Sequence, residues 1–301
     1  MDRRKFLYNS SLLAAGAVLP FKNMWAAAPG KFNTLRRNVG YFTERGGTIG
    51  WLASDEGMAV IDSQYAKTAK HCLNGLKDRS NHPLDLLINT HHHGDHTSGN
   101  PVFKGTAEKM AAHENVPKLM KQANKESEGE GNTAYPTTTY AESWQMDLGD
   151  ETIHAKYYGP GHTSGDSVIY FEKANVVHMG DLVFNRMNPY TDRAAGASMI
   201  NWIKILDTVA EEYPADAMYI FGHAKPEYGV TGKKEDLKVM GNYLSAVIEH
   251  VQNGIEQGMS KKEITKQKVL DGFEDFRYAD FWTLPDNLNV AFQEVKEMHN
   301  G

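Results

Sequence analysis

One short run of the sequence gathers side chains that bind metal ions. Residues 90–96 read T-H-H-H-G-D-H, and the side chains with ligand chemistry belong to His91, His93, Asp95 and His96. Alternate residues of an extended loop point the same way, so His91 and His93 can meet one ion while Asp95 and His96 turn toward another. The run therefore predicts a metal site carried by a loop.

Three further ligand types follow at a distance, each directly after a glycine. They are His162 in G-H-T, Asp181 in G-D and His223 in G-H, and each comes after a turn or a strand-like run. Loops at the carboxyl ends of strands are where α/β proteins usually build their sites. Zinc accepts these ligands, but iron and manganese stay open because the same donors suit several metals.

The other histidines have no motif around them. A purification tag would lie at a terminus and hold no aspartate, so it does not explain residues 90–96. His92 fills a variable position of that run, and we expect it not to be a ligand. Core or surface roles are expected for the remaining seven, which are His71, His82, His113, His154, His178, His250 and His299.

The order and spacing of the seven candidate ligands resemble the metallo-β-lactamase superfamily. Its T-H-x-H-x-D-H signature fits residues 90–96 at every position, and the resemblance extends over residues 39–223. It implies an α/β fold of the four-layered αβ/βα sandwich type, with a dinuclear metal centre on one edge. By the family's pattern, His91, His93 and His162 hold the first ion, Asp95, His96 and His223 hold the second, and Asp181 bridges both.

The resemblance implies a dinuclear hydrolase with two Zn²⁺ ions and a small-molecule substrate. A metal-bridging hydroxide would attack the carbonyl of an ester, lactone, thioester or amide. Asp95 would orient the hydroxide and could carry its proton, which makes it the candidate catalytic residue. Three alternatives stay open: a β-lactamase acting on β-lactam antibiotics, an iron-dependent oxidoreductase of the same superfamily, and a binding protein that has lost catalysis.

Differences from other branches of the family narrow the range of expected activities. Classical zinc β-lactamases place a cysteine in the second site, whereas this chain has Asp181 there and its only cysteine is Cys72. Another lactamase branch shares His96 but usually lacks the bridging aspartate. The full ligand set looks like that of glyoxalase II thioesterases, acyl-homoserine lactonases and unassigned hydrolases. The lactonases carry a tyrosine three residues after the bridging aspartate, where this chain has Phe184.

Three residues beyond the ligands are candidates for substrate binding. Arg186 could clamp an anionic group with its planar donors, although pairing with Asp192 or another acid is equally expected. Tyr190 and Tyr228 could line the pocket or donate to an oxyanion, with a place at the edge of the core as the alternative. No motif identifies the substrate.

The amino terminus has the pattern of an export signal. Paired arginines and a lysine at positions 3–5 precede a short apolar stretch at residues 12–19 and three alanines at residues 26–28. This is typical of a twin-arginine signal peptide over residues 1–28, and it predicts a periplasmic protein. The apolar stretch is too short for a stable membrane anchor, although an uncleaved anchor is the alternative.

Composition excludes some function classes and leaves others open. Loss of residues 1–28 removes four basic residues and one acidic one, which moves the net charge from −6 to about −9. Such an acidic chain has no electrostatic footprint for nucleic acid. The single cysteine excludes an intrachain disulfide. The oligomeric state stays open.

Strand-like and helix-like segments alternate, which predicts a layered α/β or α+β fold. We expect one domain over residues 29–301, with a C-terminal helical cap over residues 233–301. The charged and polar segment that begins at residue 118 and the turn-rich segment that ends at residue 139 predict a surface excursion or lid. Strands are expected at residues 48–52, 58–61, 84–88, 152–158, 167–171, 175–178 and 217–221, and helices at residues 66–77, 200–213 and 233–266.

Overall fold

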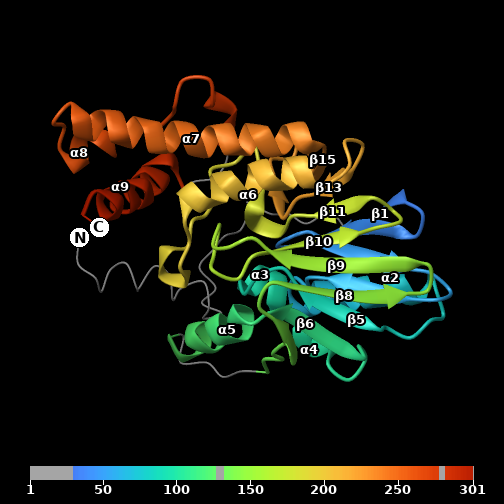
Figure 1. The fold of residues 1–301 in the computed structure, drawn as a ribbon. Coiled ribbons are helices and arrows are strands. Elements are labelled where there is room, and N and C mark those ends of the chain that lie inside the picture. Colours follow the sequence, from blue (N-terminus) through green and yellow to red (C-terminus); the bar gives the residue numbers. More distant parts are fainter. Residues whose placement is uncertain (1–29, 127–131, 278–281, 301) are drawn as a thin grey trace. The chain divides into compact units, whose positions relative to one another are not determined.

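The computed structural model describes residues 30–126, 132–277 and 282–300 (Figure 1). The predicted signal peptide and residues 127–131 of the predicted excursion or lid lie outside these ranges. The chain divides into two compact units. The first runs to Tyr157 and includes Ile169–Ala174, and the second comprises Tyr158–Val168 and the chain from Asn175 onward. The single domain expected for residues 29–301 stays a prediction.

A seven-stranded sheet forms the centre of the first unit. Its strands follow chain order, antiparallel from β1 to β4 and parallel from β4 to β7. Short turns, such as the one at Gly46, join the antiparallel strands, while helices fill the longer crossovers that parallel pairing needs. The strands are β1 (Lys31–Arg36), β2 (Val39–Thr43), β3 (Ile49–Ala53), β4 (Met58–Ile61), β5 (Leu86–Asn89), β6 (Lys109–His113) and β7 (Thr138–Tyr140).

Helix α2 (Ala66–Lys77) packs an apolar face onto this sheet. Its side chains Cys72 and Leu76 are buried in one cluster with Trp51, Val60 and Leu87 of the strands. Each fully buried leucine of this kind contributes roughly 1.5–3 kcal/mol. The remaining helices of the unit are α3 (Gly94–Thr97), α4 (Asn100–Phe103) and α5 (Asn115–Glu126).

A hairpin of β8 (Ser143–Leu148) and β9 (Glu151–Tyr157) completes the first unit. Leu148 pairs with Glu151, so the turn has two central residues, and Gly149 supplies the positive φ of 60° that this turn requires. Strand β10 (Ser167–Phe171) lies where the chain passes between the units.

Short strands carry the loops of the second unit. β11 (Val176–His178) pairs in parallel with β13 (Met218–Ile220), and β13 pairs with β15 (Thr231–Gly232). A separate parallel pair joins β12 (Phe184–Asn185) to β14 (His223–Ala224). Because β11 and β13 are parallel, the loops after both strands leave from the same edge.

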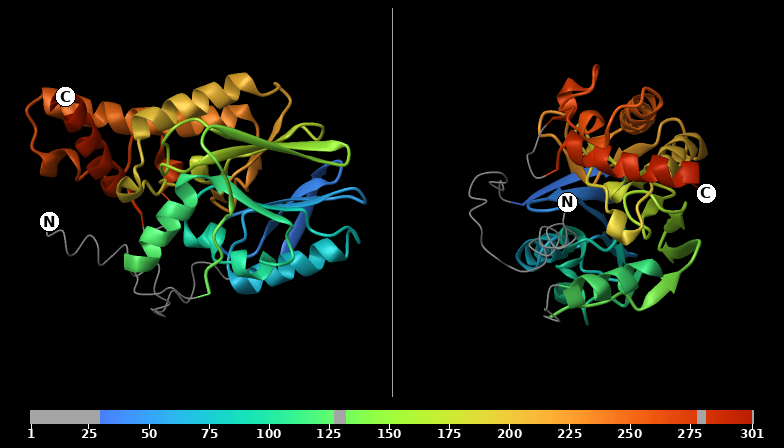
Figure 2. Two further views of the ribbon diagram at one scale, coloured as in Figure 1. Left: turned by 60° about the horizontal axis from the view of Figure 1, so that its bottom comes forward. Right: turned by 90° about the vertical axis from the view of Figure 1, so that its left-hand side faces the viewer.

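Helices are the longest elements of the second unit. They are α6 (Met199–Glu212), α7 (Lys234–Glu256), α8 (Lys261–Ile264) and α9 (Leu284–Asn300), with the 3-10 turns η1 (Gly180–Leu182), η2 (Arg193–Ala195) and η3 (Glu274–Phe276). Figure 1 shows α6 and α7 side by side, and Figure 2 shows α9 against α7 from two further directions. Among the described residues, no helix is both long enough and apolar enough to cross a membrane.

Several predicted elements are confirmed with their bounds. The helix at residues 66–77 and the strands at residues 58–61 and 167–171 are α2, β4 and β10. Helix α6 buries Trp202 and Ile205 as well as the expected Leu206, whereas Ile203, predicted on the same face, is only half-buried.

Two helical regions differ from what the sequence pattern indicates. Helix α5 replaces the start of the excursion predicted from residue 118, because Val116 and Met120 give an otherwise polar segment one buried face. The helix predicted at residues 233–266 is two helices, α7 and α8. Gly258 adopts a φ of 71° after the end of α7, and Ser260 caps the start of α8.

Candidate metal centre

The loop at residues 90–96 leaves β5 at the carboxyl edge of the parallel part of the sheet. Strands β4 and β5 are parallel neighbours, with Ile61 opposite Ile88. The residues that follow them therefore meet at one edge, and Asp62 comes to lie beside Thr90. The backbone N–H of Thr90 donates to Asp62 Oδ1 at 2.8 Å.

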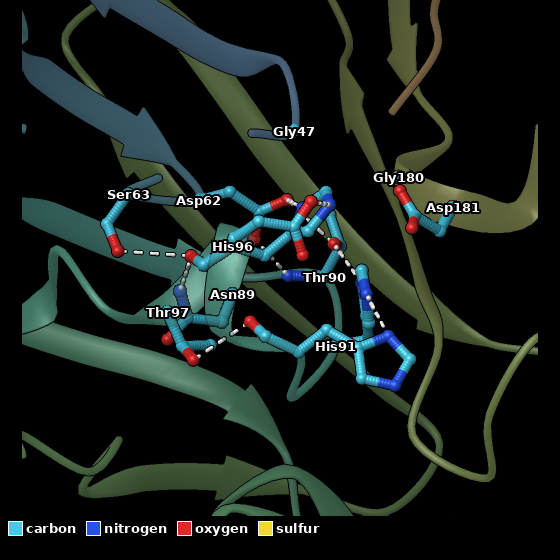
Figure 3. Close-up of polar contacts among 12 residues, drawn as sticks. Gly47, Asp62, Ser63, Asn89, Thr90, His91, His96, Thr97, Gly180 and Asp181 are labelled. Carbon is cyan, nitrogen blue, oxygen red and sulfur yellow. Dashed lines mark hydrogen bonds and ion pairs between the residues drawn. The ribbon is translucent and has the colours of Figure 1, made fainter. Parts of the chain in front are cut away.

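Asp62 orients ligands of both predicted ions (Figure 3). Its Oδ2 lies 2.7 Å from His96 Nδ1 and accepts a hydrogen bond from the Thr90 hydroxyl, also at 2.7 Å. Because that hydroxyl proton is used, Thr90 Oγ1 accepts from His91 Nδ1, which lies 3.0 Å away. With both Nδ1 atoms acting as donors, His91 and His96 present Nε2 as the metal-binding atom. All four side chains are buried.

The four candidate ligands of this loop lie close together. His91 Nε2 lies 3.1 Å from His93 Nδ1, and His96 Nε2 lies 3.7 Å from Asp95 Oδ2. The His91 and His96 rings are also close, with 4.2 Å between centroids, so the division of these ligands between two ions stays a prediction. Asp95 is the more accessible member, with its side chain 24% exposed against 0% for His96.

The glycine turn between β2 and β3 fits closely against these ligands. A Cβ atom on Gly47 would lie 2.1 Å from His96 Cε1, and one on Gly46 would lie 2.9 Å from Asp95 Cβ. Gly47 also accepts a hydrogen bond at its carbonyl from the buried Gln64 amide, at 2.7 Å. The absence of a side chain at Gly47 is therefore what allows the turn to approach His96.

In the second unit, two candidate histidine ligands lie close to one oxygen of the third candidate ligand, Asp181. His178 of β11 pairs with Ile220 of β13, so Asp181 and His223 follow parallel strands at the same edge. Asp181 Oδ2 lies 3.5 Å from His162 Nε2 and 3.4 Å from His223 Nε2. One oxygen shared by two imidazoles is the arrangement that a bridging ligand needs.

Neighbouring groups fix the orientation of these three ligands. His162 Nδ1 lies 2.7 Å from the carbonyl oxygen of Tyr190, which can only accept, so His162 also presents Nε2. Phe184 is buried and stacks on the His223 ring, with 5.2 Å between centroids. A Cβ atom on Gly222 would lie 2.0 Å from Asp181 Oδ1. Asp181 is thus held against bare backbone.

The three candidate substrate residues have partners within the second unit. Arg186 Nε lies 3.1 Å from Asp275 Oδ2, and the Tyr228 hydroxyl donates to the same oxygen at 3.3 Å. Arg186 also lies 3.9 Å from Asp236 Oδ1, so the acids that pair with it are Asp275 and Asp236 rather than Asp192. Tyr190 packs edge-on against Trp282, and burial raises the pKa of its phenol. A substrate role for Arg186, Tyr190 and Tyr228 stays a prediction.

Sequence reasoning missed Asp62 and Tyr65, which both follow β4. Only the parallel pairing of β4 with β5 brings Asp62 to the ligand loop, and the motif itself gives no sign of this. Burial and, to a smaller degree, the charge of Asp95 raise the pKa of Tyr65 to about 12. The Tyr65 phenol is therefore a hydrogen-bond donor beside Asp95 at neutral pH.

Five of the histidines outside the motif have ordinary partners. His71 pairs with Glu44 and His154 with Glu172, and the other three contact backbone carbonyls: His82 that of Pro83, His113 that of Ala141 and His250 that of Ile264. His178 is buried in β11 and accepts a hydrogen bond from the backbone N–H of Gly180, next to Asp181. The expected core or surface roles fit these contacts.

Known proteins place the chain in a family. Residues 43–223 match the metallo-beta-lactamase superfamily, and the chain belongs to it. Metallo-beta-lactamase IND-1 of Chryseobacterium indologenes is 25% identical over 225 residues, covering 73% of this chain and 90% of its own. A hydroxyacylglutathione hydrolase of Crocosphaera subtropica is 30% identical over 132 residues, covering 43% of this chain and 44% of its own.

A solved structure confirms the predicted fold class, an α/β fold of the metallo-β-lactamase type. The metallo-beta-lactamase from Pontibacter korlensis has a TM-score of 0.60 at 18% identity, and the match covers 72% of this chain and 99% of that one. Family membership and the histidine and aspartate groups together support a metal-dependent hydrolase.

Proposed function

We propose that this protein is a zinc-dependent hydrolase that uses two metal ions to cleave a bond at the carbonyl of an ester, lactone, thioester or amide. The observation that carries the proposal is the position of Asp181 Oδ2, 3.5 Å from His162 Nε2 and 3.4 Å from His223 Nε2. A carboxylate oxygen shared in this way fits two ions, one beside each histidine.

The donor chemistry fits zinc. We assign His91, His93 and His162 to the first ion and Asp95, His96 and His223 to the second, with Asp181 shared between them. Counting the shared carboxylate, each ion would have four protein ligands, so water or substrate would enter as a fifth ligand, a coordination number that catalytic zinc can reach. Bound zinc would bring the pKa of water close to neutral and polarise a carbonyl oxygen.

The protein's own groups have separate roles in this proposal. Asp62 and the Tyr190 carbonyl keep three imidazoles in the tautomer that binds metal. Asp95 is partly exposed, which suits a carboxylate that orients a water molecule and accepts its proton. Tyr65, protonated beside Asp95, can donate a hydrogen bond to a substrate oxygen.

The substrate class follows from what the site contains and what it omits. Phe184 is buried against His223 and offers no hydroxyl to a lactone carbonyl. The sole cysteine, Cys72, lies on the buried face of α2, so the second ion has only nitrogen and oxygen donors. These features favour a carboxylic ester or a thioester as the substrate. β-Lactam cleavage is the second candidate, because IND-1 matches over 90% of its length.

Turnover assays with metal-replete protein test the proposal. Aryl ester, thioester, lactone and chromogenic β-lactam substrates would be compared for the wild type, His93→Ala and Asp95→Asn, with His154→Gln as a control outside the site. We expect hydrolysis of at least one ester or thioester, a loss of roughly 100-fold or more in both site variants, and no change in the control.

Two results would contradict the proposal. One is full activity in His93→Ala after dialysis against a chelator, since the reaction would then not depend on the site. The other is redox-active iron in stoichiometric amounts in protein purified without added metal, which would favour the oxidoreductase. Cleavage of the β-lactam alone would select the second candidate.

Export is a separate proposal, which rests on residues 1–28 alone. We propose that the chain is delivered folded to the periplasm and loses this segment there. Replacement of Arg3 and Arg4 by lysine should keep the full-length chain in the cytoplasm of a Gram-negative host. A periplasmic, processed chain from that variant would contradict a twin-arginine signal.

A further inference from the structure

We propose that the C-terminal cap positions a metal ligand, His162. Tyr243 of α7 and Asn287 of α9 bind the ligand-holding loop, which we define as residues 187–191. The carbonyl group of Tyr190 in this loop in turn fixes the orientation of the His162 imidazole. The inference rests on the proposed function, because it treats His162 as a ligand. Tyr243 and Asn287 are positioning residues, since they act through the loop and not on the substrate.

The first link is the bond between the loop and His162. The Tyr190 carbonyl oxygen is 2.7 Å from His162 Nδ1 and forces the proton onto that atom. The backbone N–H of Asp192 donates to the His162 carbonyl at 3.1 Å, so the ring and the backbone of this residue are tied to the same segment. A displaced loop would release His162 to rotate and to change tautomer.

Asn287 supplies the second link. Its side chain is fully buried, and its amide donates to the Pro189 carbonyl at 2.7 Å and lies 3.3 Å from Thr191 Oγ1. These two contacts lie on either side of Tyr190 in the chain. Asn287 thus holds the peptide segment that presents the Tyr190 carbonyl.

Tyr243 supplies the third link. Its hydroxyl is 2.7 Å from Asn188 Oδ1 and 3.0 Å from Asn287 Oδ1, so one buried phenol contacts both the loop and Asn287. The Tyr243 ring stacks on Phe276 at 4.3 Å, and the Phe276 carbonyl accepts a hydrogen bond from the backbone N–H of Asn188 at 3.0 Å.

The buried polar groups of this network depend on one another for their hydrogen bonds. Tyr243 and Asn287 have 1% and 0% of their surface exposed, and a buried polar group without its partner is expensive. Apolar side chains would fill the same interface without this constraint, but they would not define where the Tyr190 carbonyl points. The polar contacts therefore serve the geometry of the loop as well as the packing of the cap.

Two measurements on metal-free and metal-titrated protein test the inference. Nitrogen NMR of ¹⁵N-histidine-labelled protein reports the tautomer of each imidazole, and His162→Ala identifies the His162 signal. Tyr243→Phe keeps the stacking on Phe276 and removes both hydroxyl contacts, while Asn287→Leu keeps the volume. We expect a single Nδ1–H tautomer in the wild type and a mixture of tautomers in both variants.

Cobalt(II) titration gives the metal readout. In both variants we expect about a tenfold or greater loss of affinity for one of the two ions and no change for the other. Ile264→Ala is the matched control, because it removes a buried side chain that packs on Gly254, 11 residues along α7 from Tyr243. It should lower the melting temperature and leave the His162 signal and both cobalt affinities unchanged.

The outcomes separate the inference from the proposed function. A wild-type tautomer and wild-type cobalt binding in Tyr243→Phe and Asn287→Leu would overturn the inference. So would equal effects in Ile264→Ala, since loosening of the cap would then explain them. Unchanged cobalt binding in His162→Ala would instead overturn the proposed metal centre, while the tautomer measurement would still decide whether the cap positions the histidine.

Discussion

Asp62 is the residue on which the ligand geometry of the first unit depends. Its buried carboxylate accepts hydrogen bonds from the backbone N–H and the hydroxyl group of Thr90 and from His96 Nδ1. Through the Thr90 hydroxyl it also orients His91. Hydrogen bonds from a carboxylate to ligand histidines fix the tautomer and raise the basicity of the metal-binding nitrogen. A single side chain thereby prepares one ligand for each of the proposed ions.

Asp62→Asn should weaken the binding of both ions. The amide has one acceptor oxygen where the carboxylate has two, so it cannot accept from the Thr90 N–H on one side and from His96 Nδ1 and the Thr90 hydroxyl on the other. With its NH2 group facing His96 and the Thr90 hydroxyl, both His96 and His91 lose the contacts that fix their tautomers, and zinc affinity should fall by about 10–100-fold. Competition with a chromogenic chelator measures the affinity. Asp85→Asn is the control, since Asp85 accepts from the Met58 N–H at the opposite end of β4. Equal zinc affinities for Asp62→Asn and the wild type would refute the role of Asp62.

Gly222→Ala should displace Asp181. The added methyl group would lie 2.0 Å from Asp181 Oδ1 and 2.8 Å from the Gly180 backbone, so a side-chain rotation alone cannot relieve the clash. A shift of about 1 Å in a reacting group can cost roughly 100-fold in rate, and we expect a loss of that size in turnover together with a lower metal content. Unchanged turnover and metal content in this variant would show that Asp181 is not held where the proposal needs it.

At the scale of elements, helix α7 carries a glycine that the fold does not require. A Cβ atom on Gly241 would meet nothing closer than Leu206 Cδ1 at 3.9 Å, which is ordinary contact. Gly241→Ala should therefore raise the free energy of unfolding by about 0.5–1 kcal/mol, because alanine has the higher helix propensity. Denaturant titration measures the change, and a lower stability would mean that α6 and α7 pack more tightly than these distances indicate.

Strand β6 ends on a histidine whose burial couples stability to pH. Burial lowers the pKa of His113 below its usual value near 6.5, despite the Ala141 carbonyl that lies 2.9 Å from its Nε2. The unfolded chain then binds the proton more readily than the folded one, so stability falls as pH decreases through about 6.5. The unfolding free energies of the wild type and His113→Gln would be measured at pH 8 and pH 5.5. Relative to the variant, the wild type should be less stable at pH 5.5 than at pH 8. A pH-independent difference would contradict this.

The elements also show what the sequence can and cannot predict. Apolar periodicity was enough for α2 and β4, whose burial follows directly from their side chains. It failed at α5, where only Val116 and Met120 are buried. The ligand motifs could be read from spacing alone. Asp62 could not, because its role exists only once β4 pairs in parallel with β5, a contact between segments far apart in sequence.

At the scale of the whole molecule, the family match runs through both units. Residues 43–223 include the ligand loop of the first unit and all three ligands of the second. Each unit presents imidazole and carboxylate groups that its own hydrogen bonds hold in a metal-binding orientation. The two-ion proposal assigns ligands from both sets to each ion, so metal binding should depend on both.

The metal content of the saturated protein tests the central claim most directly. Wild-type protein, saturated with zinc at neutral pH and freed of excess metal, should contain two zinc ions per chain by inductively coupled plasma mass spectrometry. Asp181→Ala should hold clearly fewer, because both ions lose the shared carboxylate. One ion or none in the wild type, or two ions in Asp181→Ala, would contradict a dinuclear centre bridged by Asp181.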